Sequence, residues 1–116
     1  MSYRNDFKQE IFDKVSKHLL KQNKKALNRL VGGCAYRSRS GKLKCAAGCL
    51  IPDSEYHVSM EGQIARNLEF FDDFGYSLLE ISLVDELQVI HDKSSPSRWK
   101  EKLQQCAKDH GLVVNF

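Results

Sequence analysis

Three of the four cysteines lie close together in the chain, at Cys34, Cys45 and Cys49. Thiolate sulfur and imidazole nitrogen are the preferred ligands of tetrahedral zinc, so these cysteines together with His57 are a candidate zinc site, with His91 as another fourth ligand. The spacing argues against it, because three residues separate Cys45 from Cys49 where the common zinc knuckle has two. Free cysteine is also among the most buried residue types. We therefore predict packing cysteines and no cofactor, with zinc as an alternative.

A cysteine nucleophile is a second interpretation of the same residues. Cys49 near a helix start would have a lowered thiol pKa, and His57 or His91 would be its base. Nothing in the sequence places either histidine against it. The chain also has no Walker-type phosphate loop, no dinucleotide fingerprint and no GxSxG elbow. These observations favour a binding protein over an enzyme.

A basic segment precedes the last two of these cysteines. It contains four cations and one aromatic residue, and no acidic residue occurs between Cys34 and Ile51; the five are Tyr36, Arg37, Arg39, Lys42 and Lys44. Cations position phosphates and an aromatic ring stacks on bases, so the segment is a candidate surface for nucleic acid or an acidic protein. The alternative is a solvated turn.

The charge is divided unevenly along the chain. Residues 1–50 contain 12 Lys/Arg and 3 Asp/Glu, whereas residues 51–116 contain 6 Lys/Arg and 12 Asp/Glu. The two halves either attract each other within one fold or present a basic face to an acidic partner.

The elements that must position these residues are mostly helical. Helical spacing of apolar residues, together with capping signals, predicts helices over 6–20, 59–71, 77–92 and 96–110. Leu79, Leu83, Leu87 and Ile90 are the expected inner line of the third. Residues 24–31 are a short helix or a loop, residues 46–50 a helical turn, and residues 112–116 a final strand or a strap over the core.

Two short segments, 34–37 and 43–46, flank a Ser/Gly-rich turn and predict a β-hairpin, with Cys34 opposite Cys45 if the turn centres on Arg39 and Ser40. The predicted fold class is α+β: a mostly helical single domain over residues 1–116, with four to five helices and one short hairpin.

A longer pattern runs through most of the chain: CxYR from Cys34, KCAxGCLIPD from Lys44, Tyr56, Glu61-Gly62, and LQxIHD from Leu87. It resembles a family of small uncharacterised proteins of phages and bacterial genomes. The resemblance implies a compact module that binds and redirects a host component. If the polar residues of the pattern converge on the Cys45–Cys49 corner, they form either a buried network or a pocket that leaves Arg37 or His91 free for a ligand.

The leading functional prediction is a small non-catalytic phage-type protein that engages a host protein or nucleic acid through the basic hairpin, in host takeover or anti-defence. One alternative is a pocket protein that binds or sequesters a small phosphorylated ligand such as a nucleotide, with Tyr36, Arg37 and His91 lining the site. Another is a zinc-stabilised adaptor. No apolar run is long enough for a membrane span, so we expect a cytoplasmic protein, in the host cell if phage-encoded, with no membrane partner. The oligomeric state stays open.

Overall fold

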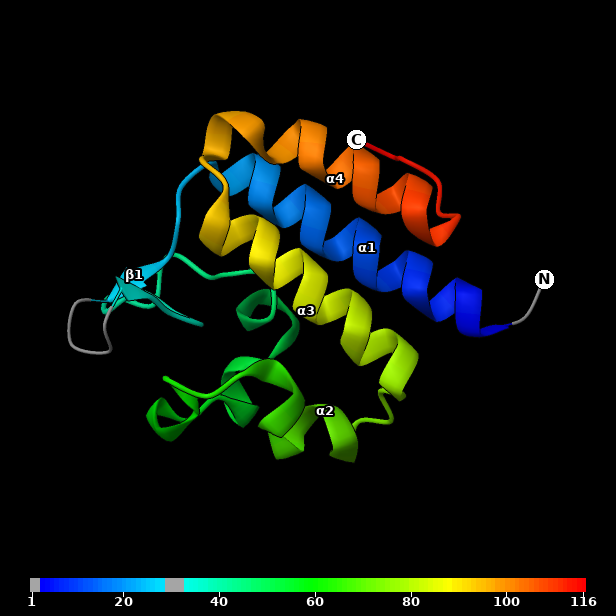
Figure 1. Cartoon of the computed structure of the whole chain (residues 1–116). Helices are drawn as coiled ribbons and strands as arrows, with labels where there is room; N and C mark the ends of the chain where they lie inside the picture. The colour runs from blue at the N-terminus through cyan, green and yellow to red at the C-terminus, as the bar shows by residue number, and fades with distance from the viewer. Residues whose placement is uncertain (1–2, 29–32) are drawn as a thin grey trace.

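Three long helices form the body of the molecule (Figure 1). This computed structural model describes residues 3–28 and 33–116, and its long helices are α1 (Tyr3–Gln22), α3 (Leu78–Lys93) and α4 (Pro96–His110). α1 and α3 run in the same direction, and α4 runs back against them, so that each helix contacts the other two. The short helix α2 (Glu69–Asp73) lies on the far side of α3 from α4.

The ends of α3 and α4 follow the predicted capping signals. At the start of α3 the Glu80 amide donates to Ser77 Oγ and the Ser77 amide donates to Glu80 Oε1, which is a complete capping box. α4 starts at Pro96, whose missing N–H is no loss at a first helical position. It ends at Gly111, which takes the left-handed conformation at φ 67°.

The core lies between the three long helices. Apolar residues at helical spacing in α1 pack inward: Ile11, Phe12, Val15 and Leu19 are buried, and Phe7 is partly buried against them. The corresponding residues of α4 are buried as well, and its Trp99 is fully enclosed. The placement of Leu79 on the inner line of α3 is wrong, because its side chain is 59% exposed. Leu79 is the second residue of α3, so it lies at the end of the helix, one turn before Leu83, where the buried line begins.

The predicted α+β class and its β-hairpin are wrong. Helices account for most of the described residues. Extended pairing within the described chain is limited to β1 (Leu27–Asn28) with β2 (Gly33–Cys34) and one antiparallel pair, Arg37 with Lys44. In this register Cys34 pairs with Leu27 and not with Cys45. No hairpin extends from the Arg37–Lys44 pair, because beyond Cys45 the chain turns into the 3₁₀ helix Gly48–Leu50.

The continuous helix predicted over residues 59–71 is also wrong. The segment contains two separate 3₁₀ turns, Val58–Met60 and Ala65–Asn67, before α2 begins. Gly62 between them has φ 84°, a left-handed conformation that interrupts a right-handed helix. The apolar residues at helical spacing here have different surroundings: Leu68 and Phe71 are buried, Met60 is partly buried and Ile64 is 59% exposed.

The C-terminal tail, residues 112–116, forms a strap, which is one of the two predictions made for it from the sequence. Its first residue, Leu112, donates its amide to the Ala107 carbonyl, and Gln9 of α1 hydrogen-bonds both backbone groups of Val113 at 2.9 Å. The ring of Phe116 packs against Phe12 with centroids 6.3 Å apart.

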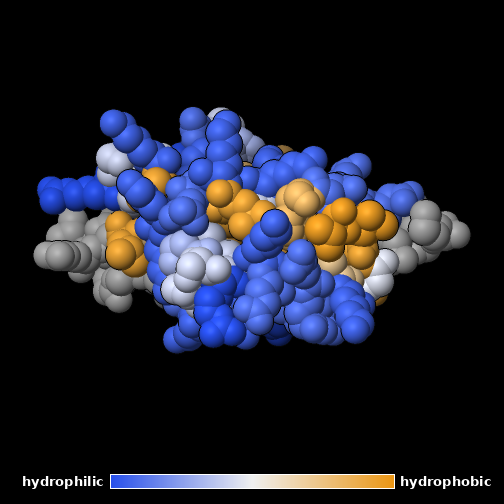
Figure 2. Space-filling view, turned by 90° about the horizontal axis from the view of Figure 1, so that it is seen from above, coloured by the Kyte–Doolittle hydropathy of each residue, from blue (hydrophilic) through white to orange (hydrophobic). Residues whose placement is uncertain are grey.

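Viewed from above, the surface is mostly hydrophilic, with an interrupted hydrophobic band across its middle (Figure 2). No described helix is both long enough and apolar enough to cross a membrane.

Candidate functional site

The glycine-and-cysteine corner is a point of close backbone approach. A Cβ on Gly48 would collide with the carbonyl oxygen of Tyr36, so only glycine lets these two segments meet. The Tyr36 carbonyl already accepts from the Cys45 amide at 3.1 Å, which holds it in place. The small residues around Gly48 are buried with it. The corner therefore fixes the basic segment to the core.

The sulfur atoms of the corner are occupied by neighbouring backbone groups. Cys45 Sγ accepts from the Gly48 amide at 3.2 Å, and Cys49 Sγ donates to the Ala46 carbonyl at 3.1 Å. Burial raises the pKa of both thiols, that of Cys49 to about 12. Protonated, enclosed thiols are poor nucleophiles. The structure thus gives no support to Cys49 as a catalytic group.

The predicted zinc residues do not meet in the described part of the chain. Cys45 is fully buried, whereas His57 is exposed. Within the described residues, these two do not belong to any group whose ligand atoms are close enough to hold a metal ion. The side chain of Cys34 lies outside what the structure describes. The zinc-stabilised adaptor therefore gains no supporting geometry from these four residues.

Glu61 binds the basic segment from the other side. Its Oε1 accepts from the Tyr36 amide at 2.9 Å, and its Oε2 accepts from the Arg37 amide at 3.2 Å and from the Tyr56 hydroxyl at 2.6 Å. One carboxylate thus satisfies two backbone donors and a phenol. Desolvation and the Glu61 carboxylate raise the pKa of Tyr56 to about 12, which keeps that phenol a donor.

Arg37 is held in place by its neighbours. Its Nη2 donates to the Ile51 carbonyl at 2.9 Å, its Nη1 pairs with Asp53 at 2.7 Å, and its guanidinium lies 4.4 Å from the centroid of the Tyr56 ring. The side chain is only 11% exposed. Arg37 is therefore committed to the fold, and it is not a cation projecting toward a partner.

His91 is enclosed in the core with both ring nitrogens bonded. Its Nε2 accepts from the Ala26 amide at 3.0 Å, so its Nδ1 carries the hydrogen and donates to Asp92 Oδ1 at 2.7 Å. The ring stacks on Trp99 with centroids 5.4 Å apart. Tyr36 is likewise buried, and its hydroxyl donates to the Gln63 carbonyl. These polar residues are bonded within the fold in two groups, one around Glu61 and one around His91. Arg37 Nε is buried without a hydrogen-bond partner among the described residues.

The exposed cations of the basic segment lie on a fixed loop. Gly41, at φ 78°, donates to the Ser38 carbonyl, and Ser38 also bonds both backbone groups of Leu43, closing the turn. Arg39 and Lys42 at its tip are exposed. They have no ion pair with any residue in the described ranges.

The base of this loop is tied to α1. Gln22 bonds both backbone groups of Lys44 at 2.9 Å, and His18 Nε2 donates to the same carbonyl at 2.9 Å. The Lys44 ammonium lies 3.7 Å from Asp53 and stays partly exposed. The loop therefore adds to the helix surface around His18.

That helix surface is also basic. Lys14, Lys17 and Lys21 lie on one face of α1 around His18, because their spacings are three and four residues. Lys14 and Lys44 both lie near enough to His18 and to Cys49 to act on the ionisation of these two groups. No acidic residue occurs anywhere from Lys14 to Pro52. The lysines of this helix were not singled out from the sequence; the signal that could have found them is the unbroken absence of acidic residues.

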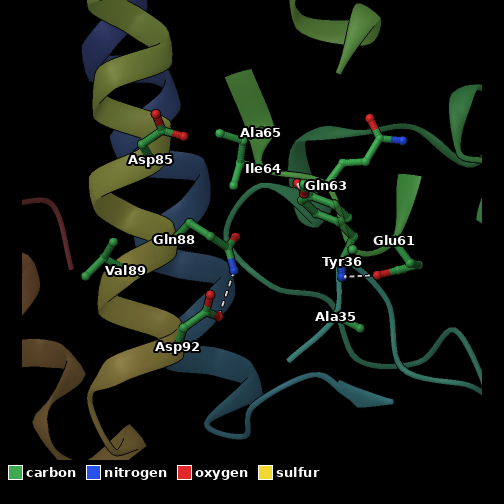
Figure 3. Close-up of a pocket in the computed structure, with 11 residues that line it drawn as sticks. Ala35, Tyr36, Glu61, Gln63, Ile64, Ala65, Asp85, Gln88, Val89 and Asp92 are labelled. Atoms are coloured by element: carbon green, nitrogen blue, oxygen red, sulfur yellow. Dashed lines mark hydrogen bonds between the residues drawn. The ribbon is translucent and has the colours of Figure 1, made fainter. Parts of the chain in front are cut away.

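A cleft of about 360 Å³ lies between α3 and residues 61–65 (Figure 3). Among the described residues, three carboxylates line it, those of Glu61, Asp85 and Asp92, and no Lys or Arg does. Figure 3 shows Gln88 bonded to Asp92 and Glu61 turned toward the Tyr36 amide. An acidic lining repels phosphate. The cleft therefore does not support the predicted phosphorylated ligand.

Comparison with known proteins adds no relative: no family model, curated protein or solved structure matches this chain.

Proposed function

We propose that this chain is a small non-catalytic protein that binds an acidic macromolecule of a host cell through a basic face. We define this basic face as six cations on α1 and on the loop tied to it: Lys14, Lys17, Lys21, Arg39, Lys42 and Lys44. The proposal includes the cytoplasmic, phage-type setting that the sequence pattern implies, with a role in host takeover or anti-defence.

The observation that carries the proposal is the attachment of the loop to α1. The Gln22 amide and the His18 ring hold the Lys44 backbone, so two basic segments that are distant in sequence form one surface. Like charges placed together raise the free energy of the unbound protein, and a polyanionic partner relieves that repulsion. Five of the six cations have no ion pair with a described residue, while Lys44 is 3.7 Å from the exposed Asp53.

The same structure favours binding over catalysis. The thiols of Cys45 and Cys49 are enclosed, and their pKa values are raised by burial. Both nitrogens of the His91 ring are engaged in the core. The cysteines and the histidine that were considered for catalysis from the sequence thus contribute to the packing beneath the basic face.

The test is a charge-reversal experiment with a matched control. The protein is immobilised and exposed to bacterial lysate as three forms: the unaltered chain, Arg39→Glu with Lys42→Glu, and Lys100→Glu with Lys102→Glu. The control pair lies exposed on α4 and changes the net charge equally. We expect the unaltered chain and the control to retain the same component, and the loop variant to lose it.

The affinity for that component is then measured against salt concentration. For duplex DNA, log K should fall with log salt by about 0.9 for each phosphate contacted, and the loop variant should show a shallower slope. For an acidic protein, the association rate should fall with salt and the dissociation rate should change less. A partner that both variants retain equally, or an affinity independent of salt, contradicts the proposal.

A further inference from the structure

Three side chains of different types meet between α3 and α4, on residues that the proposed function does not use. Cys106 and His110 are four residues apart in α4, so both point from the same side of that helix. Glu86 reaches them from α3: its Oε2 accepts from Cys106 Sγ at 3.1 Å and from His110 Nε2 at 2.6 Å. The three ligand atoms all lie within 4.8 Å of one another.

Sulfur, imidazole nitrogen and carboxylate oxygen are together the ligand set of zinc and similar divalent ions. In a tetrahedral zinc site the sulfur and the nitrogen would each be about 3.3–3.5 Å from the carboxylate oxygen. The present separations, 3.1 Å for the sulfur and 2.6 Å for the nitrogen, are shorter because hydrogen bonds hold these atoms together. The nitrogen and the carboxylate oxygen would have to move about 0.7 Å further apart to hold an ion.

The burial of the three residues also fits a metal site. The Cys106 residue is only 3% exposed, whereas the His110 side chain is 19% and the Glu86 side chain 44% exposed. The sulfur therefore lies at the inner end and the carboxylate at the solvent edge. An ion can enter from that edge, and water can complete its coordination there.

We propose that Glu86, Cys106 and His110 form a binding site for a zinc-type divalent metal ion that clamps α4 to α3. The ion replaces the Cys106 thiol proton and the hydrogen that His110 shares with Glu86, so its affinity rises with pH. Burial and the Glu86 carboxylate raise the pKa of the Cys106 thiol; Asp109 raises it further, and Lys8 of α1 lowers it. The site is separate from the Cys45–Cys49 corner, whose sulfur atoms bond backbone groups.

The experiment uses the reduced, chelator-treated protein and Co²⁺ alone as the probe. We expect one equivalent to bind with an ultraviolet thiolate-to-cobalt charge-transfer band, and Zn²⁺ but not Mg²⁺ to abolish the band by displacement. The band should vanish in Cys106→Ser. His110→Gln alters a more exposed residue, and it should weaken Co²⁺ binding by about 100-fold or more, since losing even an outer-shell partner costs 10–100-fold.

The matched control is Cys49→Ser, which removes a thiol outside the site. It should keep both the band and the affinity. A chain that shows no band at one equivalent of Co²⁺ overturns the proposal. So does a band that persists in Cys106→Ser or disappears in Cys49→Ser. If Cys106→Ser does not fold, as judged by circular dichroism, His110→Gln decides the matter, and unchanged affinity in that variant overturns the site.

Discussion

Replacing Glu61 with alanine tests whether the polar network holds the basic segment in place. The change removes the acceptor of the Tyr36 amide, the Arg37 amide and the Tyr56 hydroxyl. A hydrogen bond to a charged group contributes about 1.5–3 kcal/mol, and a stranded buried donor costs a similar amount. Three bonds are lost, but Glu61 is half-buried, so water can reach part of the gap. We expect the free energy of unfolding to fall by about 3–5 kcal/mol.

The assay is denaturant unfolding followed by circular dichroism, with Glu101→Ala as the control. Glu101 is also a carboxylate, but it makes only a solvent-exposed pair with Arg98 at 3.3 Å, which is worth less than about 1 kcal/mol. Glu61→Gln keeps one acceptor oxygen and places an amide N–H₂ near the remaining donors. Its loss of unfolding free energy should therefore lie between those of Glu61→Ala and Glu101→Ala. If Glu61→Ala costs no more than Glu101→Ala, the network does not stabilise the corner, and our account of Arg37 fails with it.

Three further outcomes follow from the same region. Gly48→Ala should lower the free energy of unfolding by about 3 kcal/mol, because its Cβ collides with a fixed carbonyl. In Gly41→Ala the Cβ meets nothing, so the loss should be only about 1–2 kcal/mol, from the strain of a left-handed backbone. Equal losses in the two variants would refute the close approach at Gly48. Burial lowers the pKa of His18 below 6.5, so the unfolded chain binds that proton more tightly and stability should fall as pH drops through and below 6.5. His18→Gln should flatten this part of the pH profile, and an unchanged slope would point to another group. Because the pKa of Cys49 is raised to about 12, iodoacetamide at pH 8 should modify it roughly a thousandfold more slowly in the folded than in the unfolded protein, as followed by mass spectrometry; rapid labelling of the native protein would show that the corner is open.

The long helices could be predicted from the sequence because their signals are local. Phe12 and Val15 recur at helical spacing, and Ser77 and Pro96 mark starts that depend only on the next few residues. The same spacing was misleading around Gly62, where one positive φ divides an apparently continuous stripe into separate turns. Helical spacing alone shows neither that each residue is buried, since Leu79 is exposed, nor that the backbone between the residues is continuous.

The hairpin prediction failed for a reason that lies far away in the chain. Extension of the Arg37–Lys44 pair ends where the backbone turns toward Gly48, and the outward-facing backbone groups of the two residues are bonded to the side chains of Glu61 and Gln22. Such long-range side-chain bonds leave no pattern in the local sequence. They satisfy the backbone groups that a neighbouring strand would otherwise satisfy.

The candidate site was predicted only in part. Arg39 and Lys42 are exposed, whereas Tyr36, Arg37 and His91 are bonded within the fold. The binding roles assigned to these residues from the sequence stay predictions. The polar character of Tyr36, Arg37 and His91 reflects bonding inside the fold, which a list of residue types cannot distinguish from ligand binding. The grouping of the α1 lysines with the loop, and the contact of Glu86 with residues of α4, depend on how the elements pack. Only the tertiary structure shows this packing.

The way α1 is covered has a consequence for biosynthesis. The first helix leaves the ribosome early, yet the segments that shield its apolar side are α3, α4 and the strap that ends at Phe116. Translation proceeds at about 5–20 residues per second, so this side stays uncovered for seconds while the rest of the chain is made. The apolar side of α1 is therefore covered only after residues far along the chain have been made.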